Sequence, residues 1–363
     1  MIGYRARVRG CLLGGAIGDA LGAPIEFDSA DGIRQRFGPS GLAGLVPLDG
    51  RIGAVTDDTQ LTLFTVDGLI RARTGGTEPA AELWSAYRRW LATQDGSAAG
   101  PAPGWLFGQR WLHARRSPGQ ACLSGLAGGV AGRLDAPRNP DSKGCGAVMR
   151  SAPFGLLQPV DTATAFRLAV AAAVHTHGHP TGYLAAGAMA AIVHRVTGGS
   201  PLPEAARATL AELGRWPGHE ETSAAVEAAV SSRFAAGTPS MAVLAALGEG
   251  WVADEALAIG LYCALTCAEP GEVREALLLA VNHSGDSDST GSICGNLLGA
   301  LFGEEALPPD WVVVVEGRDT ITRLADDLAL AVHHAPAVRD LPAWRERYPP
   351  VNSGRAPWPG EGG

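Results

Sequence analysis

Two short clusters of acidic and hydroxyl side chains stand directly before stretches with a helical period. They are residues 56–59 (TDDT) and 286–290 (DSDST). Because Thr, Ser and Asp are favoured N-cap residues, each cluster could simply begin a helix. Capping needs only one such residue, however, and closely spaced carboxylates repel each other unless a cation lies between them. The clusters are therefore also candidate metal ligands.

All the side-chain donors in these clusters are oxygen atoms. Such a set suits Mg²⁺, Mn²⁺ or Ca²⁺ better than Zn²⁺. The second cluster begins like a calcium-binding EF-hand loop, but Leu297 stands where that loop needs a bidentate Glu. Each cluster supplies half of a metal site, and a fold that joins the halves would build a carboxylate-rich site for one or two cations.

A third segment, residues 14–26 (GGAIGDALGAPIE), is rich in small residues that permit the close approach of two helices. Asp19 and Glu26 are its polar exceptions. No strand-like stretch precedes the segment, which argues against a dinucleotide-binding fingerprint.

Two more segments could contact a ligand. The Gly-rich turn at 139–150 (NPDSKGCGAVMR) could hold a phosphate group on its backbone N–H groups, or it could be an ordinary turn. It contains the only lysine of the chain, Lys143, which favours an anion. Residues 175–180 (HTHGHP) could bind a metal, place positive charge at a helix C-terminus, or contain a single structural His.

Helical periods dominate the rest of the sequence and predict an all-α protein. Several stretches, such as 162–174, are apolar around most of their circumference and belong inside a large bundle. The predicted helices are 60–73, 79–94, 120–134, 162–174, 182–196, 202–213, 223–234, 241–247, 254–266, 271–281, 291–301 and 320–333. Residues 311–315 (WVVVV) are the one candidate strand.

We expect a single globular domain over residues 1–340, followed by a Pro/Gly-rich, poorly ordered tail over 341–363. The sequence has no repeat of fixed period and no linker in mid-chain. Segments 28–55 and 95–119 are rich in Gly and Pro and are predicted to be long loops, which in compact domains are often functional.

The composition argues against several classes of protein. The 363 residues carry 37 Asp and Glu against 29 Lys and Arg, a net charge of −8, which argues against nucleic-acid binding through a basic surface. No apolar run reaches the ~20 residues of a membrane helix. We expect the N-terminal apolar stretch to be a core helix and not a signal peptide. The six scattered Cys are interpreted as reduced, mostly buried thiols of a cytoplasmic protein.

Taken together, these segments resemble the ADP-ribosylglycohydrolase family. The resemblance covers most of residues 8–303 and is carried by GCLLGGAIGDALGAPIEF, VTDDTQLTLF, AYRRWLATQ, SKGCGAVMRSAPFGLL, HTHGHP and NHSGDSDSTGSICGNLLGALFG, in that order. It implies one large, compact orthogonal helical bundle. It also implies an enzyme that uses two divalent cations, Mg²⁺ or Mn²⁺, to hydrolyse the C1″ glycosidic bond of ADP-ribose attached to a protein side chain, a small molecule or a nucleic-acid base.

The resemblance also assigns roles to residues. It implies metal ligands at Thr56, Asp57, Asp58, Asp286, Asp288 and Ser289. It implies a catalytic centre that includes Glu26, Asp57, Asp58 and Asp288, with Glu26 or a metal-binding carboxylate as general base. It implies a diphosphate-binding loop at Ser142, Gly144, Cys145, Gly146 and Met149. It implies a ligand contact from His177, with weaker claims for His175 and His179.

One loop departs from the family pattern. In relatives, an acidic and Asn-containing loop contacts the distal ribose, and here it reads TQDGS at 93–97, followed by an Ala/Pro/Gly-rich stretch. Asp95 is the candidate for the equivalent residue. Because this loop borders the leaving group in relatives, the linkage that is cleaved stays open.

Two other functions stay open at this point. A binding or structural relative without catalysis would be expected to lose carboxylates, whereas both Asp pairs and Glu26 are present. A metal-dependent nucleotide phosphohydrolase often uses His-Asp ligand sets, and this sequence has no His-Asp dipeptide. The expected partner is ADP-ribose or an ADP-ribosylated target, and the expected state is a monomer or weak oligomer.

Overall fold

Two Gly-rich helices, α1 (Tyr4–Gly22) and α15 (Ser287–Phe302), pack antiparallel along most of their length in the computed structural model, which describes residues 2–100, 103–235 and 240–350. A Cβ atom on Gly14 would lie 2.3 Å from the carbonyl oxygen of Gly295, and one on Gly18 would lie 1.9 Å from that of Gly291. Only residues without a side chain allow two backbones to come so close. The pairing places the end of α1 beside the start of α15.

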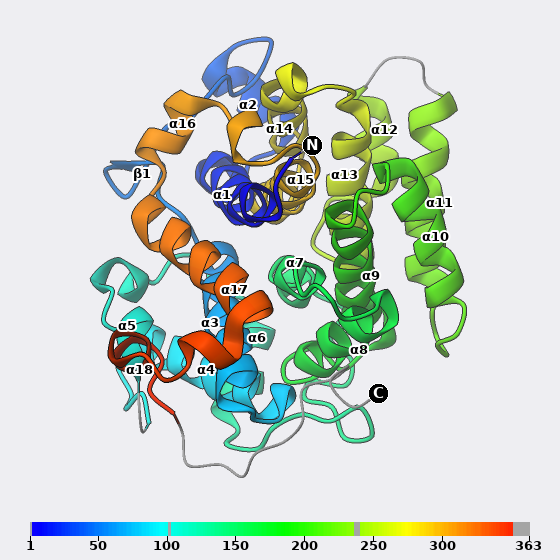
Figure 1. The fold of residues 1–363 in the computed structure, drawn as a ribbon. Coiled ribbons are helices and arrows are strands. Elements are labelled where there is room, and N and C mark those ends of the chain that lie inside the picture. Colours follow the sequence, from blue (N-terminus) through cyan, green and yellow to red (C-terminus); the bar gives the residue numbers. More distant parts are fainter. Residues whose placement is uncertain (1, 101–102, 236–239, 351–363) are drawn as a thin grey trace.

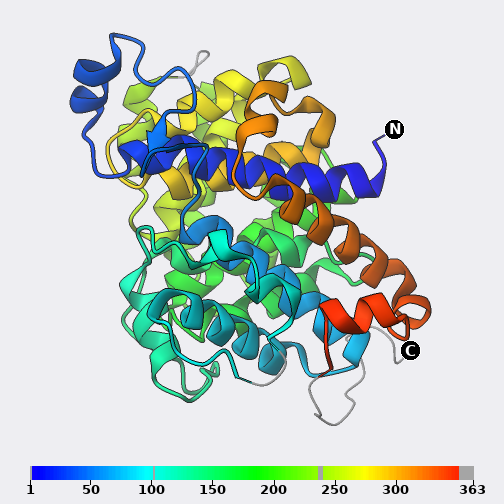
Figure 2. The ribbon, with the colours of Figure 1, turned by 90° about the vertical axis from the view of Figure 1, so that its left-hand side faces the viewer.

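A second layer of helices lies across this pair. α17 (Arg318–Val338) packs on both α1 and α3 (Asp57–Gly75), as Figure 2 shows for α17 and the dark blue α1. α4 (Pro79–Asp95) covers α3 in turn. α3 is buried on nearly all sides, so that its polar residues, among them Asp57, Asp58 and Asp67, lie in the interior of the molecule.

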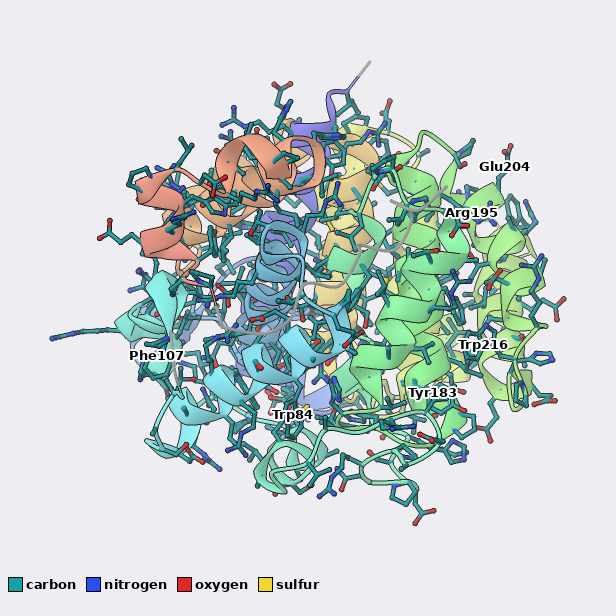
Figure 3. All side chains as sticks on the ribbon, turned by 60° about the horizontal axis from the view of Figure 1, so that its bottom comes forward. Trp84, Phe107, Tyr183, Arg195, Glu204 and Trp216 are labelled. Atoms are coloured by element: carbon teal, nitrogen blue, oxygen red, sulfur yellow. The ribbon has the colours of Figure 1, made fainter. Side chains whose placement is uncertain are left out.

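The other half of the molecule is a stack of helices on the right of Figure 1. It consists of α8 (Thr162–Ala173), α9 (Pro180–Thr197), α10 (Leu202–Leu213), α11 (Glu220–Ala235) and α13 (Ala253–Thr266). Figure 3 shows Glu204 of α10 at the outer edge of this stack. The central α9 contacts α8, α10 and α13, and its side chains are almost all buried.

Shorter elements complete the chain. They are η1 (Ala23–Ile25), α2 (Ala30–Phe37), β1 (Pro47–Leu48), β2 (Arg51–Ile52), α5 (Gly104–Phe107), η2 (Arg110–His113), α6 (Gln120–Ala127), η3 (Cys145–Ala147), α7 (Ala152–Gly155), α12 (Met241–Leu247), η4 (Pro270–Glu272), α14 (Val273–Val281), η5 (Glu304–Ala306), α16 (Pro309–Val314) and α18 (Pro342–Arg347). β1 and β2 form a two-stranded antiparallel hairpin. The all-α prediction is confirmed, and within the described residues no helix combines the length and hydropathy needed to cross a membrane.

The predicted strand at 311–315 is wrong. Most of this segment lies in the short helix α16, in which the N–H of Val315 donates to the carbonyl oxygen of Trp311 at 3.0 Å. The helix buries Trp311 and exposes Val313 and Val314. No strand of the described residues pairs with this segment, so the β-propensity of the valine run does not decide its structure.

Other boundaries also differ from the prediction. The helix predicted over 120–134 ends at Ala127, before Gly128 and Gly129. The two predicted loops contain short elements, namely α2 and the β1–β2 hairpin in the first, and α5 and η2 in the second. Their short lengths leave too little periodicity to be recognised.

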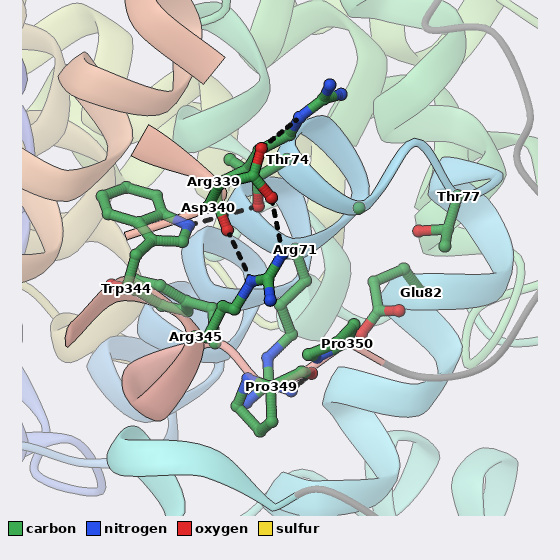
Figure 4. A pocket seen from close by; sticks show the side chains of 12 residues that line it. Arg71, Thr74, Thr77, Glu82, Arg339, Asp340, Trp344, Arg345, Pro349 and Pro350 are labelled. Atoms are coloured by element: carbon green, nitrogen blue, oxygen red, sulfur yellow. Dashed lines mark hydrogen bonds and ion pairs between the residues drawn. The ribbon is translucent and has the colours of Figure 1, made fainter. Parts of the chain in front are cut away.

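The tail predicted from 341 begins with a packed helix, α18. Trp344 is buried and donates its indole N–H to Thr74 at 3.4 Å, and Tyr348 donates its hydroxyl to Asp327 at 2.9 Å. A cavity of about 250 Å³ lies at this contact, and Asp340 on its rim pairs with Arg345 at 2.5 Å (Figure 4). The chain therefore stays packed against α3 and α17 beyond residue 340, and residues 351–363 lie outside the described residues.

Candidate active site

The two acidic clusters meet in space at the first turns of α3 and α15. Thr56 caps α3 by accepting the N–H of Asp58 at 3.3 Å, and Asp286 caps α15 by accepting that of Ser289 at 3.3 Å. The Thr56 hydroxyl oxygen also lies 3.2 Å from Asp288 Oδ2, across 232 positions of sequence. Each cluster therefore caps a helix and still has carboxylates left over, as the sequence interpretation allowed.

Asp19, on the neighbouring α1, ties the start of α3 in place. Its carboxylate accepts the backbone N–H groups of Thr56, at 3.0 Å, and Thr59, at 3.1 Å, together with both hydroxyls. Burial raises the pKa of Asp19 to about 6, against the lowering effect of these donors. Sequence reasoning noted Asp19 only as a polar exception. The sequence signal for a role of Asp19 was a single carboxylate within the apolar, Gly-rich stretch at residues 10–25.

Three carboxylates from different parts of the chain converge. Glu26, Asp286 and Asp288 each offer an oxygen atom, and these atoms lie within 4.8 Å of one another. All three side chains are more than nine-tenths buried. Glu26 Oε2 and Asp58 Oδ2 are buried without a hydrogen-bond partner. A buried carboxylate oxygen that accepts no hydrogen bond destabilises the fold, and a bound cation would remove this cost.

Burial and crowding change the proton affinity of this cluster. Burial, and then the charge of neighbouring carboxylates, raises the pKa of Asp57, Asp58 and Asp288 well above the usual range of an aspartate. Burial raises the pKa of Glu26 to about 7, although a hydrogen bond from Ser117 opposes it. A divalent cation would reverse this effect because it neutralises the repulsion. The residues present therefore fit a site for hard cations.

A cavity of about 180 Å³ opens onto the cluster. The predicted site residues that line it are Glu26, Asp57, Asp58, Gly144, Cys145, Gly146, Met149, His177, Asp286, Asp288 and Ser289. Thr56 is fully buried behind the lining, where it contacts Asp19 and Asp288. One cavity thus brings together most of the predicted metal ligands and most of the predicted diphosphate loop.

Besides Thr56, two predicted site residues are not among those that line the cavity. Asp95 is exposed at the end of α4, where it accepts the backbone N–H of Ser97 at 2.8 Å. Ser142 lies within the Gly-rich turn, and its carbonyl oxygen accepts the N–H of His179 at 3.3 Å. The structure therefore gives Asp95 and Ser142 local hydrogen bonds and places neither on the cavity wall.

The Gly-rich turn is fastened to the segment before α13. The N–H of Cys145 donates to the carbonyl oxygen of Trp251 at 3.2 Å, and the N–H of Ala253 donates to that of Lys143 at 2.8 Å. The Lys143 ammonium group pairs with Glu221 at 2.7 Å. The only lysine of the chain therefore forms an ion pair on the surface. The residues of the turn that line the cavity include Gly144, Cys145 and Gly146.

Only one of the three His residues at 175–180 lines the cavity. His177 is buried, contacts the Thr176 hydroxyl at 2.8 Å, and has its pKa lowered to about 3, first by burial and then by Arg150. His175 contacts the carbonyl oxygen of Ala80 at 3.0 Å. His179 caps α9. Of the three, only His177 is therefore placed to contact a ligand in this cavity.

Sequence reasoning missed part of the cavity wall. The predicted loop 95–119 contributes Ser117 and Gly119. The next two residues, Gln120 and Ala121, begin α6, and Trp251 precedes α13. Trp251 is 39% exposed and stacks on Phe27, which is 76% exposed, with ring centroids 5.7 Å apart. No motif or period marks these positions. The one available signal was the unusual length of the loop.

Comparison with known proteins agrees with this geometry. The chain is 25% identical over 307 residues to an ADP-ribosyl-[dinitrogen reductase] glycohydrolase of Rhodospirillum rubrum, covering 84% of this chain and 89% of that protein. It is 26% identical over 343 residues to the ADP-ribosylarginine hydrolase Tri1 of Pseudomonas putida (strain GB-1), covering 93% and 81%. A solved structure titled ADP-ribosylglycohydrolase-related protein complex shares the fold, with a TM-score of 0.61, 24% identity and coverage of 91% and 99%.

The family model described as ADP-ribosylglycohydrolase matches residues 2–337. This range includes both acidic clusters, the Gly-rich turn and all the helices that position them. On the strength of that match across nearly the whole sequence, the chain belongs to the ADP-ribosylglycohydrolase family.

Proposed function

We propose that this chain is a metal-dependent hydrolase that releases ADP-ribose by cleaving the C1″ glycosidic bond to its target. The convergence of Glu26, Asp286 and Asp288 in one cavity carries the proposal, because buried oxygens of Glu26 and Asp58 lack partners there. The names of the two bacterial relatives support the same reaction class.

The metal ligands in this proposal surround the cavity on two helix starts. Thr56, Asp57 and Asp58 on one side, with Asp286, Asp288 and Ser289 on the other, would hold two Mg²⁺ or Mn²⁺ ions. When bound, these ions would polarise a water molecule and the hydroxyl oxygens of the distal ribose. Gly119 helps to hold Asp57 in place by donating its N–H at 3.2 Å.

Glu26 is the proposed general base. Burial raises the pKa of Glu26 above that of an ordinary glutamate, so its carboxylate accepts a proton from attacking water more readily. Ser117 lines the same cavity as Glu26. The base acts while positive charge develops on the sugar, since glycoside cleavage passes through an oxocarbenium-like transition state.

The rest of the cavity would bind the parts of ADP-ribose that do not react. The Gly144–Gly146 backbone and Met149 line the wall and would hold the diphosphate, but the N–H of Cys145 is already bonded to Trp251. His177 is neutral at pH 7 and offers a hydrogen bond without charge. The exposed face of Trp251 suits an aromatic base. Contacts to these unreacting parts of ADP-ribose provide binding energy that helps to position the reacting C1″ carbon.

The decisive experiment follows free ADP-ribose by mass spectrometry. The purified protein is incubated with arginine-linked, serine-linked and base-linked ADP-ribose and with O-acetyl-ADP-ribose, each with Mg²⁺, Mn²⁺ or EDTA. We expect ADP-ribose release that requires the cation, and the substrate that reacts identifies the linkage.

Other products would point elsewhere. Release of phosphate or AMP instead of ADP-ribose would identify a phosphohydrolase. Binding of ADP-ribose without turnover of any substrate would identify a binding protein.

A further inference from the structure

A second cavity lies at the opposite end of α15 from the candidate active site. It has a volume of about 370 Å³ and forms where the start of α10 meets the ends of α11, α13 and α15. Because an α-helix rises about 1.5 Å per residue, the 16 residues of α15 span about 24 Å. Among the described residues, none lines both cavities, so the second cavity is a separate feature of the molecule.

The wall of this second cavity is apolar. Eleven described residues line it, and all of them except Arg233 are Pro, Leu, Ala, Phe or Cys. Leu202 and Leu265 are buried in the wall, whereas Phe234 is 60% exposed at the end of α11, in the helical stack of Figure 1. A concave wall that is mostly apolar and has few polar groups is typical of a site for a small organic molecule.

Arg233 carries the only charge among the described residues of this wall. Its Nε donates to the carbonyl oxygen of Leu265 at 2.9 Å, at the end of α13. Across residues 2–100, 103–235 and 240–350, no carboxylate pairs with Arg233, and its two terminal nitrogens have no hydrogen-bond partner. The bond to Leu265 therefore holds the guanidinium group in place and leaves the terminal nitrogens for an anion. Arginine commonly binds a carboxylate through two parallel hydrogen bonds.

The start of α10 is a second feature that favours an anion. Leu202, the first residue of this 12-residue helix, lies on the wall, and Pro201 before it caps the helix with no side-chain hydrogen bond. The first N–H groups of a helix have no partner within the helix and carry partial positive charge. On the outer side of the wall, the Arg207 guanidinium lies 4.8 Å from the centroid of the Phe234 ring. Positive charge therefore lies beside an apolar surface.

We propose that this cavity binds a small amphipathic carboxylate, an acid with an apolar body. The carboxylate accepts hydrogen bonds from the terminal nitrogens of Arg233, and the apolar body packs against Leu202, Leu265 and Phe234. A strongly polar ligand would gain nothing from this wall, and a neutral apolar ligand would leave Arg233 without a partner. The site goes beyond the proposed hydrolase function and does not depend on it.

The test titrates the intact protein with octanoate by isothermal titration calorimetry. We expect one octanoate per chain, and Arg233→Gln should lower the affinity about tenfold or more because charge-assisted hydrogen bonds are lost. Arg215→Gln is the matched control, since Arg215 pairs with Glu212 outside the cavity and should leave the affinity unchanged. Octanol has the same kind of chain without the charge. It should bind more weakly than octanoate and equally to the parent protein and to Arg233→Gln.

A second variant tests the location of the site. Ala268 is exposed and lines the cavity, so Ala268→Trp would fill the cavity without placing a large side chain in the core. We expect this variant to lose octanoate binding and to keep the urea unfolding curve of the parent protein.

Octanoate binding that is unchanged in Arg233→Gln or in Ala268→Trp would overturn the inference, and so would no binding to the parent protein. If Arg233→Gln does not fold, the comparison with octanol and the Ala268→Trp variant still decide. Sedimentation velocity covers a different occupant of the same face. A dimer that Ala268→Trp dissociates, in a chain that binds no octanoate, would identify an interface between two copies and overturn the carboxylate site. None of these measurements uses ADP-ribose release, so this proposal and the hydrolase proposal fail separately.

Discussion

The carboxylates of the active site fall into two kinds, according to whether all their oxygen atoms already accept hydrogen bonds from the protein. Asp19 accepts N–H and hydroxyl donors from Thr56 and Thr59, so it is fully occupied by protein. Glu26 and Asp58 each keep one buried oxygen without a partner. The first kind of carboxylate positions the site, and the second kind is available to bind a cation or a proton.

Asp288→Asn should abolish turnover and leave the helical circular dichroism spectrum unchanged. The amide keeps the shape of the side chain but removes a charge from the proposed metal site, and a loss of about 10³-fold or more in ADP-ribose release is expected. Asp319→Asn is the matched control, because Asp319 is exposed near the start of α17 and pairs with Arg318 on the surface. Full activity in Asp288→Asn would reject the assignment of Asp288 as a metal ligand.

Asp19→Asn should weaken metal binding although Asp19 does not line the cavity. The amide NH₂ group would face the N–H and hydroxyl donors of Thr56 and Thr59, so the start of α3 would shift. We expect Mn²⁺ affinity to fall about 10- to 100-fold, as for other residues that orient metal ligands. The free energy of unfolding should fall by about 2 kcal/mol, since a buried donor is left unpaired. Unchanged Mn²⁺ affinity with lower stability would leave Asp19 a purely structural residue.

At the level of helices, the α1–α15 contact determines where the site forms. Gly22 at the end of α1 lies so close to α15 that a Cβ atom there would be 2.3 Å from the backbone nitrogen of Asp288. Glu26 follows only four residues later. The glycine contact therefore brings the third carboxylate to the other two, and a change in helix spacing would separate them.

Gly18→Ala should destabilise the protein by about 3 kcal/mol or more, because backbone atoms of a buried helix pair have to move apart. Its added methyl group would lie 1.9 Å from the carbonyl oxygen of Gly291. Gly3→Ala is the control on the same segment, since a Cβ atom there meets nothing within 4 Å. Urea unfolding of the two variants measures the difference. Equal stability would show that the two helices can separate at little cost.

The sequence predicts the long helices well but misses several of the shortest elements. The helices 162–174 and 202–213 agree with α8 and α10 to within one residue, because each shows several turns of apolar period. α16 and α18 each have six residues, so there is too little period to read. These two helices form because tertiary contacts bury Trp311 and Trp344.

Over the whole molecule, the sequence identifies both halves of the site but cannot show that they lie close together in the fold. Composition and capping identified the acidic clusters as ligand candidates, and the order of motifs indicated the family. The contact between Thr56 and Asp288 depends on how α1, α3 and α15 pack together. Ser117 and Trp251 line the cavity from loops. A loop has no hydrophobic period from which its path could be predicted.

Binding of Mg²⁺ should stabilise the whole chain, and the effect should grow as the pH rises. Without metal, burial raises the pKa of Glu26 from the ordinary 4.5 to about 7 and that of Asp19 from 3.8 to about 6. It also raises the pKa values of the three other carboxylates, Asp57, Asp58 and Asp288. The folded state then binds more protons than the unfolded state, so these groups lose their stabilising contribution as the pH rises through their folded pKa values.

His175 and His177 oppose this trend in the metal-free protein, because burial lowers their pKa values to about 4 and about 3. The unfolded state then binds more protons than the folded state until the pH passes the ordinary 6.5. These two groups have no place among the proposed metal ligands, so their contribution cancels when melting temperatures with Mg²⁺ and with EDTA are subtracted. Since protons and cations compete for the carboxylates, that difference should increase from about pH 5 to about pH 8. A difference independent of pH, or equally large in Asp288→Asn, would show that Mg²⁺ acts elsewhere on the protein.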